Sequence, residues 1–196
     1  VHVIGGKTGT TDEAGSCVIL YEEADNGKSY ISIVMGAQNK DVLYADVHRA
    51  AAREIAAETF VLLKNTDNLL PLEQKGRIAL IGPMADARNN MCGMWSMTCT
   101  PSRHATLLES LRSAVGDKAE ILYAKGSNIY YDERLEKGAV GIRPLERGDN
   151  RQLLDDALAT AARADIIVAA LGECAEMSGE SASRTNLNIP DAQQDL

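Results

Sequence analysis

The chain has 196 residues, a formal net charge of −8 and 45% hydrophobic residues. This length and composition allow one ordinary domain or two small ones. The acidic balance leaves no basic stripe to neutralise phosphates, so we expect no nucleic-acid partner. No apolar run approaches the roughly 20 residues of a membrane-spanning helix, and the first residues lack the layout of a signal peptide, so we expect no membrane partner.

An antiparallel β-hairpin is predicted over residues 16–37. Residues 29–36 alternate polar and apolar side chains, residues 16–21 form the other strand, and Asp25-Asn26-Gly27 supplies the turn. From His48 onward the apolar spacing becomes helical for about four turns. We therefore place a boundary near Val47–His48.

The rest of the chain alternates short apolar strands with helical segments. The strands are predicted at residues 77–83, 119–124 and 165–171, with helices at 106–111 and 153–161 before the second and third strand. This pattern is typical of a parallel sheet covered on both faces. The predicted fold class is α/β: a partial parallel sheet with helices on both faces, preceded by an antiparallel β-hairpin. The glycine-rich and charged residues 127–150 predict a surface excursion that lines a site.

The four cysteines are scattered along the chain, and none forms a Cys-x-x-Cys pair; they are Cys17, Cys92, Cys99 and Cys174. This spacing predicts neither a disulfide framework nor a metal site, and we expect no cofactor. Cys92 and Cys99 can bridge in an oxidising compartment, although small buried thiols are the commoner outcome.

Glu180 is the main candidate for chemistry. It lies in the loop 173–184, which is rich in small and polar residues and follows the strand 165–171 directly. In an open α/β sheet, ligands bind at the carboxyl ends of strands, so an acidic loop there is where we expect a general acid. Glycoside hydrolysis needs a second carboxylate across the scissile bond.

Residues 1–47 contain Lys7-Thr8-Gly9, followed by Thr10-Thr11-Asp12-Glu13-Ala14-Gly15 and the hairpin. This segment resembles the third active-site motif of the D-alanyl-D-alanine carboxypeptidases. The resemblance implies that the lysine and threonine lie on an edge strand and hold a substrate carboxylate. The Ser-x-x-Lys and Ser-x-Asn motifs of that chemistry do not occur upstream, so we interpret the segment as a remnant or a structural hairpin.

Residues 48–196 contain several long motifs in order: the stretch from His48 to Asn65, Leu70-Pro71-Leu72, the stretch from Ile78 to Asp86, and the stretch from Asn188 to Gln194. Together they resemble glycoside hydrolase family 3, in particular its bacterial β-glucosidases. The resemblance implies a (β/α)8-like barrel with an aspartate nucleophile, followed by an α/β sandwich domain that donates the acid/base glutamate. This chain is similar to the opening part of the second domain.

The resemblance assigns roles to individual residues. Glu180 matches the acid/base position, with Glu173 and Glu176 as rivals in the same loop. Trp95 resembles the tryptophan in the wall of the aglycone subsite, where an indole stacks on a sugar ring; core packing is the alternative. Asp86 and Arg88 follow the first strand and are candidate substrate-binding residues, with turn capping as the alternative.

We therefore predict a β-glucosidase-like glycoside hydrolase, or a part of one, that acts on a β-glucoside or oligosaccharide by a retaining mechanism. The nucleophile is expected in a barrel that residues 1–47 are too few to build. The two resemblances, 1–47 and 48–196, predict a chimeric or truncated product. The alternatives are a non-catalytic carbohydrate-binding module and a carboxypeptidase remnant. The resemblance suggests a bacterial periplasmic or secreted location, and a homo-oligomer could cover the open sheet edges.

Overall fold

The structure is a computed structural model. It describes residues 2–11, 15–23, 27, 29–38, 40–93, 99–136, 146–178, 182 and 185–196. The chain divides into two compact units, Val1–Leu70 and Pro71–Leu196, which are described separately.

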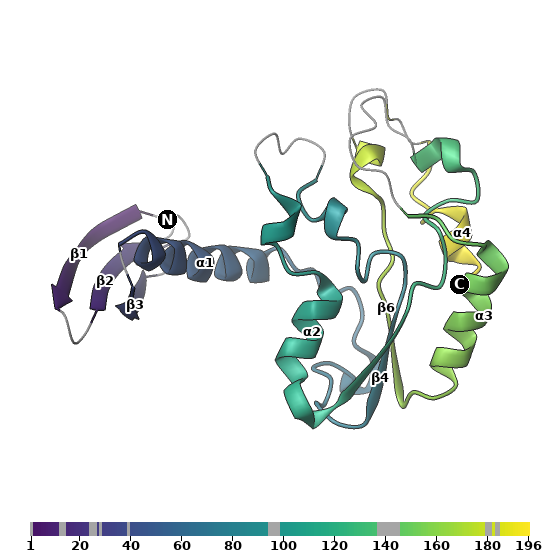
Figure 1. Ribbon diagram of the computed structural model, residues 1–196, viewed down its shortest axis with the longest axis horizontal. Coiled ribbons are helices and arrows are strands. Elements are labelled where there is room, and N and C mark those ends of the chain that lie inside the picture. Colours follow the sequence, from purple (N-terminus) through teal and green to yellow (C-terminus); the bar gives the residue numbers. More distant parts are fainter. Residues whose placement is uncertain are drawn as a thin grey trace. The chain divides into compact units, whose positions relative to one another are not determined.

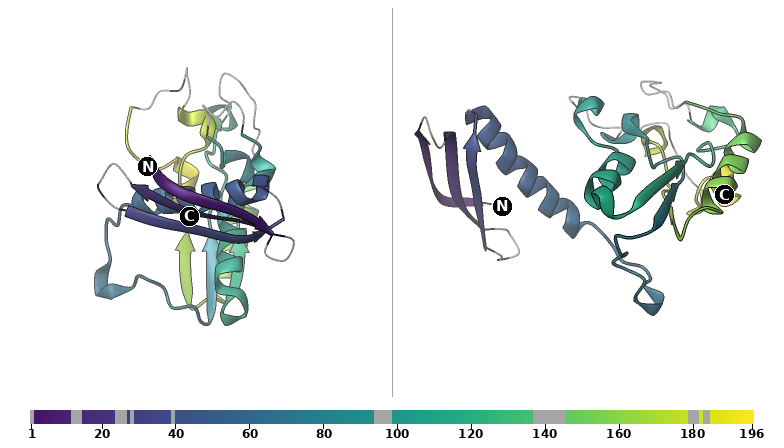
Figure 2. Two further views of the ribbon diagram at one scale, coloured as in Figure 1. Left: turned by 90° about the vertical axis from the view of Figure 1, so that its left-hand side faces the viewer. Right: turned by 60° about the horizontal axis from the view of Figure 1, so that its bottom comes forward.

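The first unit is a three-stranded antiparallel sheet with one helix (Figures 1 and 2). Its elements are β1 (His2–Thr11), β2 (Gly15–Glu23), β3 (Ser29–Ala37) and α1 (Lys40–Glu58). The predicted hairpin is confirmed, since β2 and β3 pair with Ile19 opposite Ile33. The predicted turn residues Asp25 and Asn26 lie outside the described residues. The local pattern did not predict β1, because its glycines and threonines carry no clear apolar alternation; only the carboxypeptidase resemblance implied an edge strand at Lys7 and Thr8.

Alternation along β2 and β3 separates the two faces of this sheet. Val18 and Ala37 are buried with Leu20 and Val34 packed against them. The residues between them in sequence point the other way and are exposed, among them Ile19, Tyr21, Ile31, Ile33 and Met35. Successive side chains on a strand point to opposite faces, so the face that contains Val18 forms the small core of this unit. Helix α1 contacts β3 and β2.

Helix α1 begins earlier than the sequence predicted. It runs from Lys40 to Glu58, so His48 lies inside it, and the two compact units divide after Leu70. The two compact units therefore do not divide at Val47–His48, and that boundary depends on the two sequence resemblances alone. Among the described residues, no helix has the length and apolar character needed to span a membrane.

The second unit contains a parallel sheet, as predicted. Its strands are β4 (Arg77–Ile81), β5 (Glu120–Ala124) and β6 (Ile166–Ala169), in the order β5-β4-β6. Its helices are α2 (Leu107–Val115), α3 (Asn150–Ala161) and the short α4 (Asp191–Gln194). Because β4 is paired on both edges, four of its five residues are buried.

Helices cover both faces of this sheet, which confirms the prediction (Figure 1). Ala79 and Ile81 of β4 pack in one cluster with Ala157 of α3. Leu80, which points to the other face, packs with Leu108 of α2. The long helices begin at capping residues: the Thr106 hydroxyl accepts from the Glu109 amide in a capping box, and Asp149 accepts from the Gln152 amide.

The strand order fixes where a ligand can bind. The chain leaves β4 through α2 to reach β5 on one side, then crosses through α3 to β6 on the other side of β4. The direction of winding therefore reverses between β4 and β6. In open α/β sheets, the crevice at such a switch point, beyond the carboxyl ends of the strands, is where ligands bind.

Candidate functional site

The segments that follow β4 and β6 are in direct contact at the switch point. The Met84 amide donates to the Ala170 carbonyl at 3.2 Å, and the Ala175 amide donates to Asn90 Oδ1 at 2.7 Å. Gly82 makes the approach possible, because its φ is +136° and a Cβ there would lie 2.2 Å from the Ala170 oxygen. A side chain at Gly82 would force the two segments apart.

A buried glutamine fixes the start of the loop that carries Glu180. Gln193 Oε1 accepts from the Gly172 amide at 2.8 Å, and Gln193 Nε2 donates to the Gly172 carbonyl at 2.8 Å and to the Ile129 carbonyl at 3.3 Å. The Gln193 side chain is 2% exposed. Gln193 belongs to the stretch from Asn188 to Gln194 that carries part of the family resemblance. In the structure, this stretch holds the backbone of Gly172 and Ile129 through the Gln193 side chain.

The Asn128 side chain joins the two ends of the segment 127–150 by hydrogen bonds to the backbone of Gly148. Its amide donates to the Gly148 carbonyl at 2.9 Å and accepts from the Gly148 amide at 3.0 Å. The expectation of a surface excursion is only partly correct, because Ser127, Asn128 and Ile129 are buried. Residues of this segment, among them Asn128 and Glu136, line a cavity, and its use as a binding site stays a prediction.

A cavity of about 460 Å³ opens at the carboxyl ends of β4 and β5. Asp86 and Arg88 line it after β4, Tyr123 and Lys125 line it at the end of β5, and Glu136 lines it from the excursion. Its volume lies within the range of small-molecule sites. Asp86 and Arg88 were predicted from the sequence, whereas Tyr123, Lys125 and Glu136 were not. The position of these three residues at or after the end of β5 was the available signal.

Burial changes the acid–base properties of the cavity wall. It raises the pKa of Tyr123, and the Asp86 charge adds to this. Burial also lowers the pKa of Lys125, although Glu136 and Glu146 act in the opposite direction. The Glu136 carboxylate is itself held by an ion pair with Arg147 at 2.5 Å and by the Tyr130 amide at 2.8 Å. The wall therefore presents a neutral phenol beside charged donors and acceptors.

Arg88 is held by neighbouring groups as well as facing the cavity. It forms an ion pair with Glu109, and its Nη1 donates to the His104 carbonyl at 2.5 Å. The pKa of Glu109 is lowered, first by the Thr106 amide and then by Arg88. Asp86 is exposed and makes the turn into the short helix η2 (Arg88–Asn90), with its carbonyl accepting from the Arg88 amide at 3.0 Å. Both candidates thus lie at the cavity, and both also stabilise the local structure.

The other two predicted site residues, Glu180 and Trp95, lie outside the described residues. Of the rivals in the same loop, Glu173 is exposed and Glu176 is 5% exposed. Glu176 lies in the short helix η6 (Ala175–Ser178), and within the described part of the chain neither of its carboxylate oxygens has a hydrogen-bond partner. Glu176 is thus a buried carboxylate and Glu173 an exposed one, and the acid/base assignment to Glu180 stays a prediction.

Cys92 and Cys99 form a disulfide with a Cα–Cα distance of 5.8 Å. The preference for free thiols was therefore wrong for this pair. The disulfide joins the ends of the segment that contains Trp95. Cys174 is a buried free thiol, and Cys17 is a half-buried one.

Cys174 and Cys17 should differ in reactivity. Burial raises the pKa of the Cys174 thiol, with a further contribution from the Glu136 charge, and the thiolate is the reactive form. We expect a maleimide or an aromatic disulfide reagent at pH 8 to label Cys17 in the native chain and Cys174 only after urea unfolding. Mass spectrometry of the labelled peptides checks this, and equal labelling of both thiols in the native chain would contradict it.

Comparison with known proteins assigns the second unit. The sequence profile of the glycosyl hydrolase family 3 C-terminal domain matches residues 60–196. The chain is 42% identical over 156 residues to a periplasmic β-glucosidase of Salmonella typhimurium, covering 76% of this chain and 20% of that protein. It is 33% identical over 151 residues to thermostable β-glucosidase B of Acetivibrio thermocellus, covering 77% of this chain and 18% of that protein.

A solved structure shows the same arrangement. The chain matches β-glucosidase from Listeria innocua in complex with glucose with a TM-score of 0.57 and 25% identity, covering 82% of this chain and 19% of that one. The chain thus spans about a fifth of the length of these relatives. The profile match, the sequence relatives and the parallel sheet agree, and the chain belongs to glycoside hydrolase family 3, of which it contains a part of the C-terminal domain.

Proposed function

We propose that this chain supplies the acid/base part of a β-glucosidase-type active site. The observation that carries the proposal is the meeting of two segments at the switch point. The segment after β4 contains Asp86 and Arg88, the segment after β6 contains Glu180, and hydrogen bonds join the two segments directly. The described start of the loop, residues 171–178, follows β6, and the polar cavity opens at the carboxyl ends of β4 and β5, which supports the proposal.

In this proposal Glu180 protonates the leaving glycosidic oxygen and then activates water. A retaining enzyme needs a nucleophilic carboxylate about 5–5.5 Å away across the sugar, and the family resemblance places that aspartate in a barrel domain. Asp86 and Arg88 are proposed to hydrogen-bond a sugar hydroxyl, and Trp95 to stack on a sugar ring. The support is chemical: charged donors and acceptors bind sugar hydroxyls, and a planar aromatic group stacks on a sugar ring.

The proposal is tested by grafting part of this chain into a complete β-glucosidase. Residues 60–196 replace the matching segment of the Salmonella β-glucosidase, which supplies the rest of the protein. We expect the graft to hydrolyse an aryl β-glucoside, with β-glucose released first in a proton NMR time course. A graft with native circular dichroism and no hydrolysis would contradict the proposal.

The unmodified chain distinguishes catalysis from binding alone. We expect no hydrolysis by the chain itself, because residues 1–47 are too few for the barrel. A titration with glucose or cellobiose that quenches the emission of Trp95, combined with an inactive but folded graft, would favour a non-catalytic carbohydrate-binding module instead. Trp95 is the single tryptophan of the chain, so its emission is unambiguous.

For residues 1–47 we propose a carboxypeptidase-derived segment joined at Val47–His48. Its support is that Lys7-Thr8-Gly9 lies on β1, which is an edge strand of its sheet, as the resemblance implied. Lys7 Nζ donates to the Thr8 carbonyl at 2.5 Å. Without a Ser-x-x-Lys nucleophile we expect no covalent labelling by a fluorescent penicillin, and long-read sequencing of the source DNA across the junction tests the chimeric origin.

We also propose self-association through the second unit. Strands β5 and β6 are the two edges of the described parallel sheet, and Ile167 of β6 is 57% exposed. Unpaired edge strands are templates for pairing with another chain. Size-exclusion chromatography with light scattering at several protein concentrations tests this, and a monomer throughout would contradict it.

A further inference from the structure

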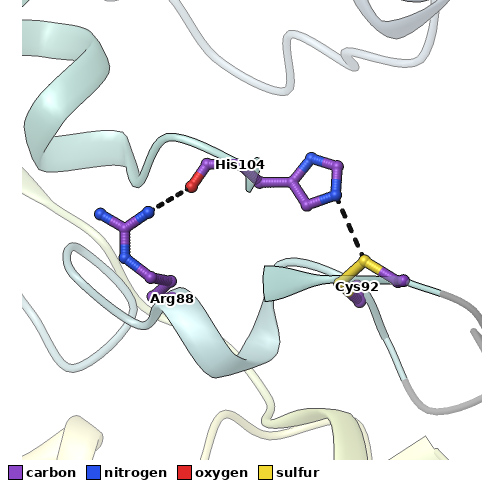
Figure 3. Close-up of a disulfide and its surroundings, with 4 residues drawn as sticks. Arg88, Cys92 and His104 are labelled. Carbon is purple, nitrogen blue, oxygen red and sulfur yellow. Dashed lines mark hydrogen bonds between the residues drawn. A yellow bond between two sulfur atoms is a disulfide. The ribbon is translucent and has the colours of Figure 1, made fainter. Parts of the chain in front are cut away.

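Cys92, Cys99 and His104 form a cluster that the mechanism above does not use. Cys92 and Cys99 share the disulfide, and His104 Nε2 lies 3.2 Å from the Cys99 sulfur (Figure 3). The two sulfurs and one imidazole nitrogen all lie within 4.8 Å of one another. The spacing of the cysteines gave no indication of this cluster, because the third member is a histidine brought in by the following turn.

The backbone around the cluster is held in place by bonds that do not involve the disulfide. Cys92 follows η2, in which the Met91 amide donates to the Arg88 carbonyl at 3.1 Å. His104 ends the short helix η3 (Pro101–Arg103), and its amide donates to the Pro101 carbonyl at 3.0 Å. Arg88 links the two elements, since its guanidinium donates to the His104 carbonyl (Figure 3). Breaking the disulfide therefore leaves these contacts in place.

The donor set suits a thiophilic cation. Two thiolates and one imidazole are ligands that Zn²⁺ prefers, with Zn–S near 2.3 Å and Zn–N near 2.0–2.1 Å. Tetrahedral bonds of that length place neighbouring ligand atoms roughly 3.4–3.8 Å apart. The three donor atoms of the cluster lie within 4.8 Å of one another, and the two sulfurs, which are bonded to each other in the disulfide, move apart by less than about 2 Å after reduction to reach that spacing. Cysteines 92 and 99 are half-buried and His104 is exposed, so an ion has access from solvent.

We propose that, after reduction of the disulfide, Cys92, Cys99 and His104 bind one Zn²⁺ ion, with a water in the fourth position. A dithiol reductant supplies two electrons and two protons to the Cys92–Cys99 bond and is itself oxidised to a disulfide. Zinc then displaces the two thiol protons, and neutral His104 donates its Nε2 lone pair. The loop between residues 92 and 99 would thus be cross-linked in both states, by sulfur when oxidised and by metal when reduced.

The test begins with the chain reduced by dithiothreitol and desalted without oxygen. We expect Co²⁺ to give a thiolate-to-cobalt charge-transfer band at one equivalent, and Zn²⁺ to abolish it by displacement. The oxidised chain should give no band, because disulfide sulfurs are not thiolates. A reduced and folded chain that gives no band overturns the proposal.

His104→Ala is the decisive variant, because it keeps both cysteines and the disulfide. Loss of even an outer-shell partner lowers zinc affinity about 10- to 100-fold, so loss of a direct ligand should lower it at least about tenfold in competition with a chromophoric chelator. His48→Ala, which removes an exposed histidine of α1, is the matched control and should bind zinc as the unmodified chain does. Equal zinc affinities of the His104→Ala and unmodified chains would show that His104 is not a ligand and would overturn the proposed site.

Discussion

Replacing Glu180 by glutamine in the grafted β-glucosidase is expected to lower kcat for an aryl β-glucoside about 10²- to 10⁴-fold, the usual contribution of a general acid–base group. Glutamine keeps the size and polarity of the side chain but can neither give nor take the proton. The alkaline limb of the pH profile of kcat/KM, which reports the protonated acid, should disappear in this variant.

Two further measurements separate catalysis from structural damage. Azide, a nucleophile that needs no base, should restore turnover of the Glu180→Gln graft and yield a β-glucosyl azide. Glu173→Gln and Glu176→Gln are the matched controls within the same loop. If either control lost activity to the same degree while Glu180→Gln kept it, the acid/base assignment would move to that residue.

Replacing Gln193 by leucine is expected to lower the free energy of unfolding of the second unit by about 2–4 kcal/mol. Leucine fills a similar volume but leaves the Gly172 amide and the Gly172 and Ile129 carbonyls without the three hydrogen bonds that Gln193 makes. The Gln193 side chain is buried, so water does not replace those bonds without rearrangement.

Gln194→Leu is the matched control for this prediction. Gln194 is exposed and makes one bond, from its Nε2 to the Ile189 carbonyl at 2.7 Å, so we expect a change within about 0.5 kcal/mol. Urea unfolding followed by Trp95 emission reports on the second unit, which contains the single tryptophan. Equal denaturation midpoints for the two variants would show that the clamp on Gly172 does not stabilise the unit.

The Gln193 clamp also connects stability to the proposed chemistry. Gly172 lies directly before the loop that carries Glu180, and both of its backbone hydrogen-bonding groups are held by one side chain. Loosening it should widen the range of positions open to Glu180. We therefore expect Gln193→Leu in the graft to lower kcat as well as stability, whereas Gln194→Leu should change neither.

Local sequence patterns predicted most of the regular structure. Strands β4, β5 and β6 are short apolar runs between helical segments, and β2 and β3 alternate, so each is visible in a window of a few residues. β1 was missed because it is an edge strand whose residues are mostly glycine, threonine and polar side chains. β1 is extended because its backbone pairs with β2. This pairing joins residues that are separated in sequence, so no local preference predicts it.

The sequence by itself therefore determined the α/β class, the order of the elements and the loop in which the acid is expected, because periodicity and the carboxyl-end rule act over short stretches. Only the tertiary structure decided which residues share a site. Lys125 and Glu136 line the cavity with Asp86, Gln193 reaches back to Gly172, and His104 meets the disulfide, since each of these pairings depends on how separate segments fold against one another. Such contacts carry no signal in local spacing, and a parallel sheet, whose strands pair across long connections, creates many of them.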